Sequence, residues 1–260
     1  MKPRVLPIIA ALTVSWPASA QEMQQPAPRQ ISLMVAGDPA GEQCRRIDPQ
    51  NTLLTTVQLH RTFHDDFDEH PLSKGRWAPH YAGGAAWPEA RYWGGDGSDF
   101  KRKTAWNGEQ QIYVDPRYAG RGSTPLGLDP FTVKDGVLSI TAMRTPPGLR
   151  EVLFNNEYTS GILTTQGSFA QKYGYFEIRS KVPAGAAVWP AFWMLADDGG
   201  WPPEIDVLEG RGQRPGDVVM TTHWRIFETQ KIHSCGFDFT VPDAISAFHD
   251  YGVLWQSDPE

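Results

Sequence analysis

The sequence predicts an all-β domain, a sandwich or jelly roll of antiparallel sheets, and three observations lead to that prediction. From Phe63 onward, short runs of Val, Ile, Tyr, Phe and Thr alternate with clusters of Gly, Pro, Asp and Asn. These runs recur at intervals of roughly ten to twenty residues, as strands joined by turns do. The 3.6-residue period of amphipathic helices is nearly absent. At 260 residues the chain has room for one large domain or two small ones.

The first twenty residues, "MKPRVLPIIAALTVSWPASA", have the pattern of a secretory signal. Two basic residues stand near the start, a short apolar stretch follows, and Ala18-Ser19-Ala20 forms a small-residue cleavage site. The apolar stretch is broken by Pro7 and Pro17 and is too short to span a bilayer, which argues against the alternative of a membrane anchor. We therefore expect cleavage before Gln21 and a secreted or periplasmic protein.

Residues 21–60 mix Gln, Pro, Ala and charged residues without periodicity, as an N-terminal arm or linker would. The globular domain is expected over residues 61–260. The chain stops at "YGVLWQSDPE", where a strand leads into a turn, so we expect a truncated sequence that lacks the last strands of the sandwich. The predicted strands include GVLSITAM, YTSGILTT, GYFEIRSKVP, AVWPAFWML, EIDVLE, VVMTTHW and YGVLW.

The charge balance excludes one class of partner. The chain carries 24 basic and 30 acidic residues, a net charge of −6, whereas nucleic-acid binding needs clustered Lys and Arg. No segment after the signal is long and apolar enough for a membrane span, so we expect neither nucleic acid nor membrane as a partner, and a monomer. An exported chain could pair its only cysteines, Cys44 and Cys235, but their separation in sequence does not decide whether they meet.

The stretch "WPPEIDVLEG" places three carboxylates in six residues of an otherwise apolar strand. Residues i and i+2 of a strand share a face, so Glu204 and Asp206 point together. Glu209 would face the opposite side of a regular strand. One β-bulge at Val207-Leu208 adds the residue that restores it, with all three acids on one face and the aliphatic residues on the other.

Two carboxylates on one face suit a retaining glycosidase, in which one attacks the anomeric carbon while the other protonates the leaving oxygen and later activates water. The carboxyls of such enzymes lie about 5–5.5 Å apart, which requires a concave sheet here. Asp206 stands between the glutamates and could share a proton with the nucleophile, so the three should titrate as a coupled group. The alternative is a solvated edge strand with scattered acids, which explains the aliphatic filling poorly.

The preceding segment, "AVWPAFWML", predicts an aromatic wall beside the acids. Trp189, Ala191 and Trp193 alternate onto one face, and indole faces stack on the C–H groups of sugars. The turn "ADDGGWPP" makes a hairpin that places these indoles beside the carboxylates. The alternative is that both indoles belong to the core.

After the acids, "GRGQRPGD" and "VVMTTHWR" predict a second hairpin. A pairing in which residue numbers sum to about 427 sets Thr221 opposite Asp206 and His223 opposite Glu204. His223 could then hydrogen-bond an acid and hold it, although a lone strand histidine is also consistent with a structural role.

The segment "TAWNGEQQIYV" adds weaker candidates for the cleft wall. Trp106 offers a stacking surface, and Asn107 and Glu109 offer hydrogen bonds to sugar hydroxyls. The same segment reads equally well as an ordinary edge of the sandwich.

With "WPAFW" followed by "EIDVLEG", the run from Tyr158 to Gly210 resembles glycoside hydrolase family 16, in the branch of bacterial β-glucanases and exopolysaccharide glycanases, and the match extends from about Phe63 to the end. The resemblance implies a concave jelly roll of the concanavalin A type. It also implies Glu204 as nucleophile, Asp206 as its assistant and Glu209 as acid/base. Members often bind one structural calcium ion on the convex side, and no cofactor for catalysis is implied.

The expected function is therefore a secreted, endo-acting retaining β-glycanase. Its expected substrates are β-1,3 or mixed β-1,3-1,4 glucans or a related bacterial exopolysaccharide. Two alternatives stay open: a jelly roll that binds glycans without cleaving them, and a transglycosylase of the same fold. The sequence does not identify the glycosidic linkage of the substrate, because it depends on loops that open or close the cleft, and their residues contain no recognisable pattern for a particular sugar.

Overall fold

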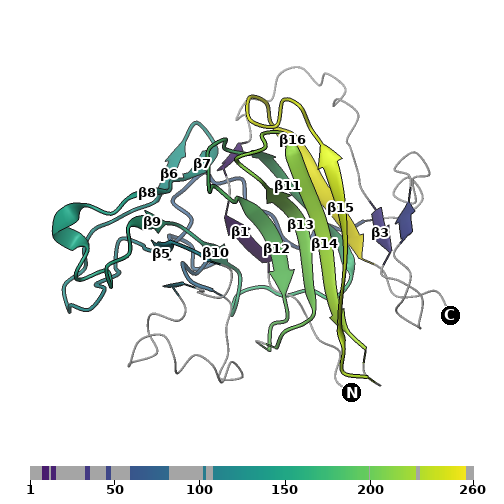
Figure 1. The fold of residues 1–260 in the computed structure, drawn as a ribbon, viewed down its shortest axis with the longest axis horizontal. Coiled ribbons are helices and arrows are strands. Elements are labelled where there is room, and N and C mark those ends of the chain that lie inside the picture. The colour runs from purple at the N-terminus through teal and green to yellow at the C-terminus, as the bar shows by residue number, and fades with distance from the viewer. Residues whose placement is uncertain are drawn as a thin grey trace.

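In the computed structural model, residues 59–81, 102–103, 108–198, 200–226 and 229–255 are described with their side chains, and four short strands before residue 59 by their backbone. Two large sheets dominate (Figure 1). The first has six strands in the order β10-β1-β12-β13-β14-β15, with bounds Leu163–Thr164, Ile8–Ala11, Ala191–Leu195, Glu204–Gly210, Asp217–Arg225 and Ile232–Thr240.

The second large sheet lies behind the first and has five strands in the order β16-β11-β2-β7-β6. Every strand pairing in these two sheets is antiparallel, as the sequence predicts for a sandwich. The bounds of the five strands are His249–Trp255, Gly174–Lys181, Thr13–Ser15, Val137–Ile140 and Phe131–Lys134.

Two small sheets stand outside the sandwich. One pairs β3 (Leu33–Val35) with β4 (Arg45–Ile47). The other has the order β5-β9-β8, with β5 at Gln111–Tyr113, β9 at Tyr158–Ser160 and β8 at Met143–Arg144. Its β5–β9 pairing is parallel, which the expectation of purely antiparallel sheets did not include.

The all-β prediction is confirmed across the described residues, where helical structure is limited to 3₁₀ turns at Arg102 and at Pro147–Leu149. Each of the seven quoted runs contains at least one strand. No helix in the described part of the chain has the length and hydropathy of a bilayer span.

The core fills the space between the large sheets. Alternate residues of each strand point inward because successive side chains of a strand face opposite sides. On β11 the buried positions Phe176 and Ile178 alternate with half-buried neighbours. The same cluster continues through both sheets and includes Leu138, Phe192, Met194, Ile205, Val207, Leu208, Val218, Met220, Tyr251 and Val253. One face of the six-stranded sheet is thereby committed to the core, which leaves the opposite face for the acids.

The strands β1 and β2 lie within the segment predicted as a secretory signal. The backbone of β1 pairs with both β10 and β12, and that of β2 with β11 and β7. Cleavage before Gln21 would remove both strands from the sheets. The signal, the arm over residues 21–60 and the truncated C-terminus all stay predictions.

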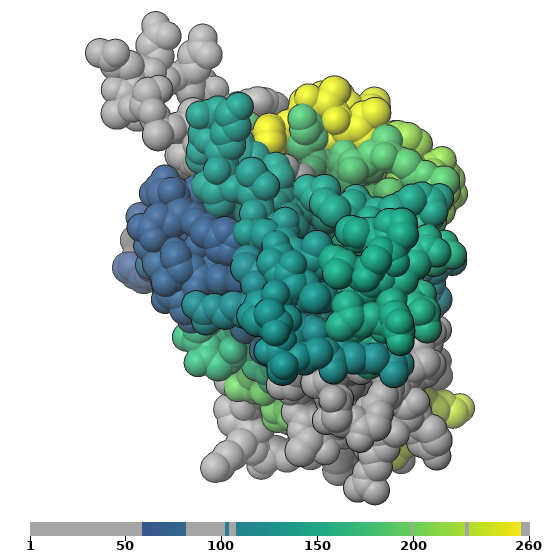
Figure 2. Space-filling view, turned by 90° about the vertical axis from the view of Figure 1, so that its left-hand side faces the viewer, coloured from purple at the N-terminus to yellow at the C-terminus, as the bar shows by residue number. Residues whose placement is uncertain are grey.

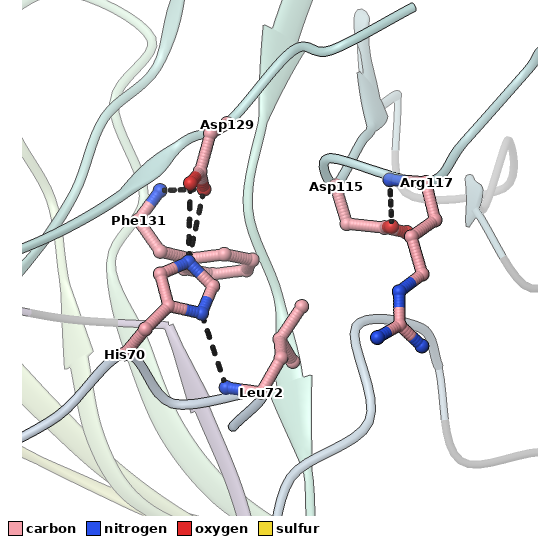
Figure 3. A network of polar contacts seen from close by, with 6 residues as sticks. All are labelled: His70, Leu72, Asp115, Arg117, Asp129 and Phe131. Atoms are coloured by element: carbon pink, nitrogen blue, oxygen red, sulfur yellow. Dashed lines mark hydrogen bonds and ion pairs between the residues drawn. The ribbon is translucent and has the colours of Figure 1, made fainter. Parts of the chain in front are cut away.

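Residues 59–81 pack against the sandwich, where Ala78 forms a bridge with Thr164 of β10, and are fastened near the start of β6. His70 Nε2 lies 3.1 Å from Asp129 Oδ2, and the backbone N–H groups of Leu72 and Phe131 donate to His70 Nδ1 and to Asp129 (Figure 3). In the space-filling view these residues, in blue, lie beside the teal segment that carries β5 to β9 (Figure 2). The segment therefore packs onto the sandwich, and the domain boundary near residue 61 stays a prediction.

Candidate active site

The site is built on β13, whose backbone contains the predicted bulge. Toward β14, Asp206 pairs with Thr221 and Glu209 with Val219, so two residues, Val207 and Leu208, stand where one would fit. Toward β12 the register shifts at the same place. The prediction of one extra residue in the acidic strand is confirmed from both neighbouring strands.

The bulge sorts the side chains of β13 between two environments. Val207 and Leu208 are fully buried and Ile205 is nearly so, all in the core between the sheets. The carboxylates of Glu204 and Glu209 stay half-buried on the other side. An apolar strand can therefore carry three acids, since its aliphatic residues provide the burial and its acids line a separate surface.

Glu204 is bound by an indole from the loop between β12 and β13. Trp201 Nε1 donates a short hydrogen bond to Glu204 Oε2. The Trp201 ring is 41% exposed and lies 6.0 Å from the ring of His223. Arg225 Nη2 donates to the carbonyl oxygen of Trp201 at 3.2 Å and so ties this loop to the end of β14.

Glu209 has a matching indole on the other side of the site. Trp189 Nε1 donates to Glu209 Oε1 at 2.9 Å, and the Trp189 side chain is 64% exposed. Trp189 precedes β12, which begins at Ala191, so it is not part of the alternating strand that the sequence suggests. Its exposure rules out the alternative of a core residue.

Asp206 is the buried member of the group, with 3% of its surface exposed. Its Oδ2 lies 3.3 Å from His223 Nε2, and His223 Nδ1 lies 2.6 Å from Ser234 Oγ on β15. The register predicted for the second hairpin is confirmed, since Thr221 pairs with Asp206 and His223 with Glu204. The imidazole of His223 therefore contacts Asp206 and not only Glu204, the residue opposite it on β13.

Burial raises the pKa of all three carboxyls. For Glu204 the charge of Asp206 adds to the desolvation, while the Trp201 hydrogen bond acts in the opposite direction. Burial and the charge of Glu209 raise the pKa of Asp206 to about 8. Desolvation also raises the pKa of Glu209, against the Trp189 hydrogen bond and the nearby positive charges. The trio therefore holds protons at a pH where isolated carboxyls have lost them.

Trp193 and Glu109 belong to one connected cluster beside β13. Trp193 pairs with Asp206 across the strands, and its ring lies 6.1 Å from that of Tyr81. Tyr81 and Tyr113 both donate their phenolic hydrogens to Glu109 Oε1. The fully buried hydroxyl of Tyr113 has a pKa raised by desolvation, so it stays a donor. Glu109 is thus linked to the acidic strand through Tyr81 and Trp193.

The structure brings most of the predicted site residues together. Glu204, Asp206, Glu209, Trp189 and His223 contact one another directly or through one shared partner. Trp106 and Asn107 lie outside the described residues, and so does Cys44. Cys235 is buried and disulfide-bonded.

Sequence reasoning missed Trp201, Ser234 and Tyr81. Trp201 lies in the quoted turn, and its position three residues before Glu204 is a usable signal once the loop is known to fold back. The contacts of Ser234 and Tyr81 depend on strands and loops distant in sequence, so no local pattern reveals them.

The site also contains a group of metal-binding side chains. Glu204, Asp206 and His223 each offer one ligand atom, and these atoms lie within 4.8 Å of one another. Within the described ranges no other group of three or more such side chains lies this close. The calcium ion expected from the resemblance stays a prediction.

Comparisons with known proteins agree with this geometry. The family model of glycosyl hydrolases family 16 matches residues 129–259, just over half of the chain. Two endo-1,3-1,4-beta-glycanases of Rhizobium meliloti, ExsH and EglC, are each 42% identical over 76% of this chain, which spans only 39% of their own length. The laminarinase of Rhodothermus marinus superimposes with a TM-score of 0.50 at 29% identity, covering 74% of this chain and 66% of that one.

Proposed function

Because the chain belongs to glycosyl hydrolase family 16, we propose that it is an endo-acting retaining β-glycanase working by double displacement. The observation that carries the proposal is the arrangement on β13. Three carboxylates share one face of a bulged strand, and an exposed indole donates to each of the two glutamates. A merely solvated strand would need neither the bulge nor the raised pKa values of its acids.

Glu204 acts as the nucleophile that attacks the anomeric carbon and forms the glycosyl-enzyme. Glu209 gives its proton to the leaving oxygen and then takes one from the water that releases the sugar. The raised pKa of Glu209 favours this role, because a general acid must be protonated when the substrate arrives.

Asp206 accepts the proton that Glu204, as the nucleophile, must lose before it attacks. Glu204 and Asp206 share a hydrogen bond, which raises the pKa of Glu204 and lowers that of Asp206. Attack requires an ionised Glu204, so this proton passes to Asp206 along the same bond. Asp206 accepts it because burial and the charge of Glu209 favour its neutral form.

The substrate is a β-1,3 or mixed β-1,3-1,4 glucan, or a bacterial exopolysaccharide with similar linkages. The named activities of the Rhizobium meliloti relatives and the Rhodothermus marinus laminarinase support this class. The exposed rings of Trp189 and Trp201 offer stacking surfaces for sugar on either side of the acids. Trp193 and Glu109 extend the binding surface toward the small sheet.

The protein acts outside the cytoplasm, as a monomer, on polysaccharide alone. The N-terminal signal pattern supports export, and polymers of this class are too large to be taken up whole. The acidic net charge supports the absence of nucleic-acid partners.

The test is hydrolysis of laminarin, mixed-linkage glucan and a succinoglycan-type polymer, measured by reducing ends and viscosity. We expect viscosity to fall well before reducing ends accumulate, as endo cleavage requires, and Glu204→Gln to abolish activity. Glu157→Gln, which changes an exposed glutamate on the small sheet side, is the matched control. Binding without new reducing ends would overturn the proposal in favour of a glycan-binding protein. Longer oligosaccharides in the product mass spectrum would instead indicate transglycosylation.

The roles of the two glutamates can be separated chemically. Glu209→Ala should lose activity on polymer but still form the glycosyl-enzyme from a substrate with a good leaving group, which needs no proton. Added azide should then restore turnover and yield a β-glycosyl azide. An α-azide product would reverse the two assignments.

A further inference from the structure

Glu204, Asp206 and His223 form a mixed nitrogen and oxygen cluster at the base of the acidic face, with ligand atoms within 4.8 Å of one another. We propose that this cluster is a binding site for a divalent transition-metal ion, and that a bound ion reversibly blocks the protein. The blocking effect rests on the proposed function, whereas the binding does not. The ion has no part in catalysis: the active state is the metal-free one.

The first support is the unsatisfied oxygen of Asp206. This side chain is more than nine-tenths buried, and its Oδ2 has no hydrogen-bond partner. The oxygen points at His223 Nε2, 3.3 Å away, without the geometry of a hydrogen bond. A buried carboxylate oxygen in this state is costly unless a cation or a proton compensates its charge.

The second support is the contact that fixes the other ring nitrogen of His223. Its Nδ1 lies 2.6 Å from Ser234 Oγ. With the hydrogen on Nδ1 donated to that hydroxyl, Nε2 directs its lone pair at Asp206. Metal-binding histidines are commonly fixed through the other ring nitrogen in this manner. When Asp206 is ionised, two lone pairs face each other and repel, and a metal ion between them would turn the repulsion into two bonds.

The composition of the cluster selects the kind of ion. Calcium and magnesium prefer sets made of oxygen alone, whereas an imidazole with two carboxylates suits zinc and its neighbours. Zinc would bind at about 2.0–2.2 Å from each atom and keep a fourth position open. Zn²⁺ is the appropriate probe because it has no redox chemistry of its own.

A bound ion would remove what the reaction needs. Zn²⁺ on Glu204 takes the lone pair that would attack the anomeric carbon, and Zn²⁺ on Asp206 takes the place of the shared proton. Sugar and ion then compete for one site, so inhibition should be competitive with substrate and reversed by a chelator.

The test measures Zn²⁺ binding by titration calorimetry and by the visible spectrum of the Co²⁺-loaded protein. We expect His223→Ala to weaken Zn²⁺ binding by at least about tenfold, the scale for changes in a metal's surroundings. His233→Ala is the matched control. That ring lies on the neighbouring strand and stacks on Trp224 at 5.8 Å, on the face of the sheet opposite to His223. The control should bind Zn²⁺ like the unmodified chain.

Unchanged Zn²⁺ affinity in His223→Ala, or an equal loss in His233→Ala, would overturn the site. If His223→Ala fails to fold by circular dichroism, Asp206→Asn replaces it and should weaken binding to a similar extent. Calorimetry needs no turnover, so a protein that binds Zn²⁺ but hydrolyses nothing refutes only the proposed function. A protein that binds Zn²⁺ but hydrolyses glucan with no change on adding Zn²⁺ or EDTA refutes the blocking effect and leaves the proposed function standing.

Discussion

The two exposed indoles act on different acids, and their removal should therefore change opposite ends of the pH profile. The hydrogen bond from Trp189 lowers the pKa of Glu209, and that from Trp201 lowers the pKa of Glu204. Phenylalanine at either position keeps an aromatic face but loses the N–H. Each glutamate should then hold its proton to a higher pH.

Trp189→Phe should raise the pKa of Glu209, the proposed general acid, so the basic limb of kcat/KM should move to higher pH. Trp201→Phe should raise the pKa of Glu204, the proposed nucleophile, so the acidic limb should move to higher pH. Each carboxylate accepts its indole hydrogen bond as an anion, so loss of the N–H disfavours the ionised form and raises the pKa. Profiles of both variants on one glucan check this, and a shift of the same limb in both would contradict the assignment of separate roles.

Asp206 should lower the free energy of unfolding as the pH rises. Its folded pKa is raised to about 8, above its unfolded value of roughly 4. The folded state therefore binds the proton more tightly, and the free energy of unfolding falls as pH rises through that window. Asp206→Asn, which needs no proton, should lose this dependence and most of the activity.

Thermal melts at pH 5 and pH 8, in EDTA, measure this effect. We expect the variant to melt several degrees above the unmodified chain at pH 8 and close to it at pH 5, on the scale of about 2–4 °C per kcal/mol. A lower melting temperature at both values would mean that the carboxylate stabilises the fold.

At the scale of the element, β13 shows how much of a strand's geometry a sequence pattern can predict. The spacing of its acids and the aliphatic residues between them were enough to place the bulge, because only one extra residue puts all three acids on one face. The register with β14 followed from the same reasoning. The loop before β13 could not be predicted, since the return of Trp201 over Glu204 depends on backbone turns that no periodicity encodes.

Deleting Val207 should test the bulge directly. The shortened strand reads E-x-D-x-E, which alternates regularly and keeps the acids on one face. Val207 is fully buried, so its loss should cost about 2–4 kcal/mol and lower the melting temperature by roughly 5–10 °C.

We expect the deletion variant to fold and retain weak hydrolysis, because Glu209 and its bond to Trp189 would be displaced by about one residue's rise, ~3.3 Å. Circular dichroism and reducing-end assays report the two effects separately. An unfolded product would show that the register downstream of β13 does not absorb the change.

At the scale of the whole molecule, the sandwich places apolar residues between the sheets and chemistry on one outer face. This division could be predicted from strand patterns and the acidic motif. The parallel pairing of β5 with β9 and the cluster around Glu109 could not, because they join segments that are distant in sequence. The substrate linkage could not be predicted for the same reason, because it depends on how loops distant in sequence come together.

The first twenty residues have two conflicting interpretations, as a signal that is cleaved and as part of the folded sheets. Export predicts a mature chain that begins at Gln21, whereas β1 lies between β10 and β12 in the six-stranded sheet. We expect the exported protein to begin at Gln21, measured by intact mass and N-terminal sequencing. Retention of residues 1–20 would contradict the signal and favour a structural role for β1.

The bulge has a further consequence for how such a site can change over time. Glu204 and Asp206 follow one register with β14, and Glu209 follows another, offset by a residue. The break separates the strand into two segments, each aligned by different neighbours. Substitutions around Val219 and Ala191 can therefore adjust Glu209, the proposed proton donor, while Glu204, the proposed nucleophile, stays in place. New leaving groups could be accommodated in small steps, without rebuilding the part of the site that forms the covalent bond.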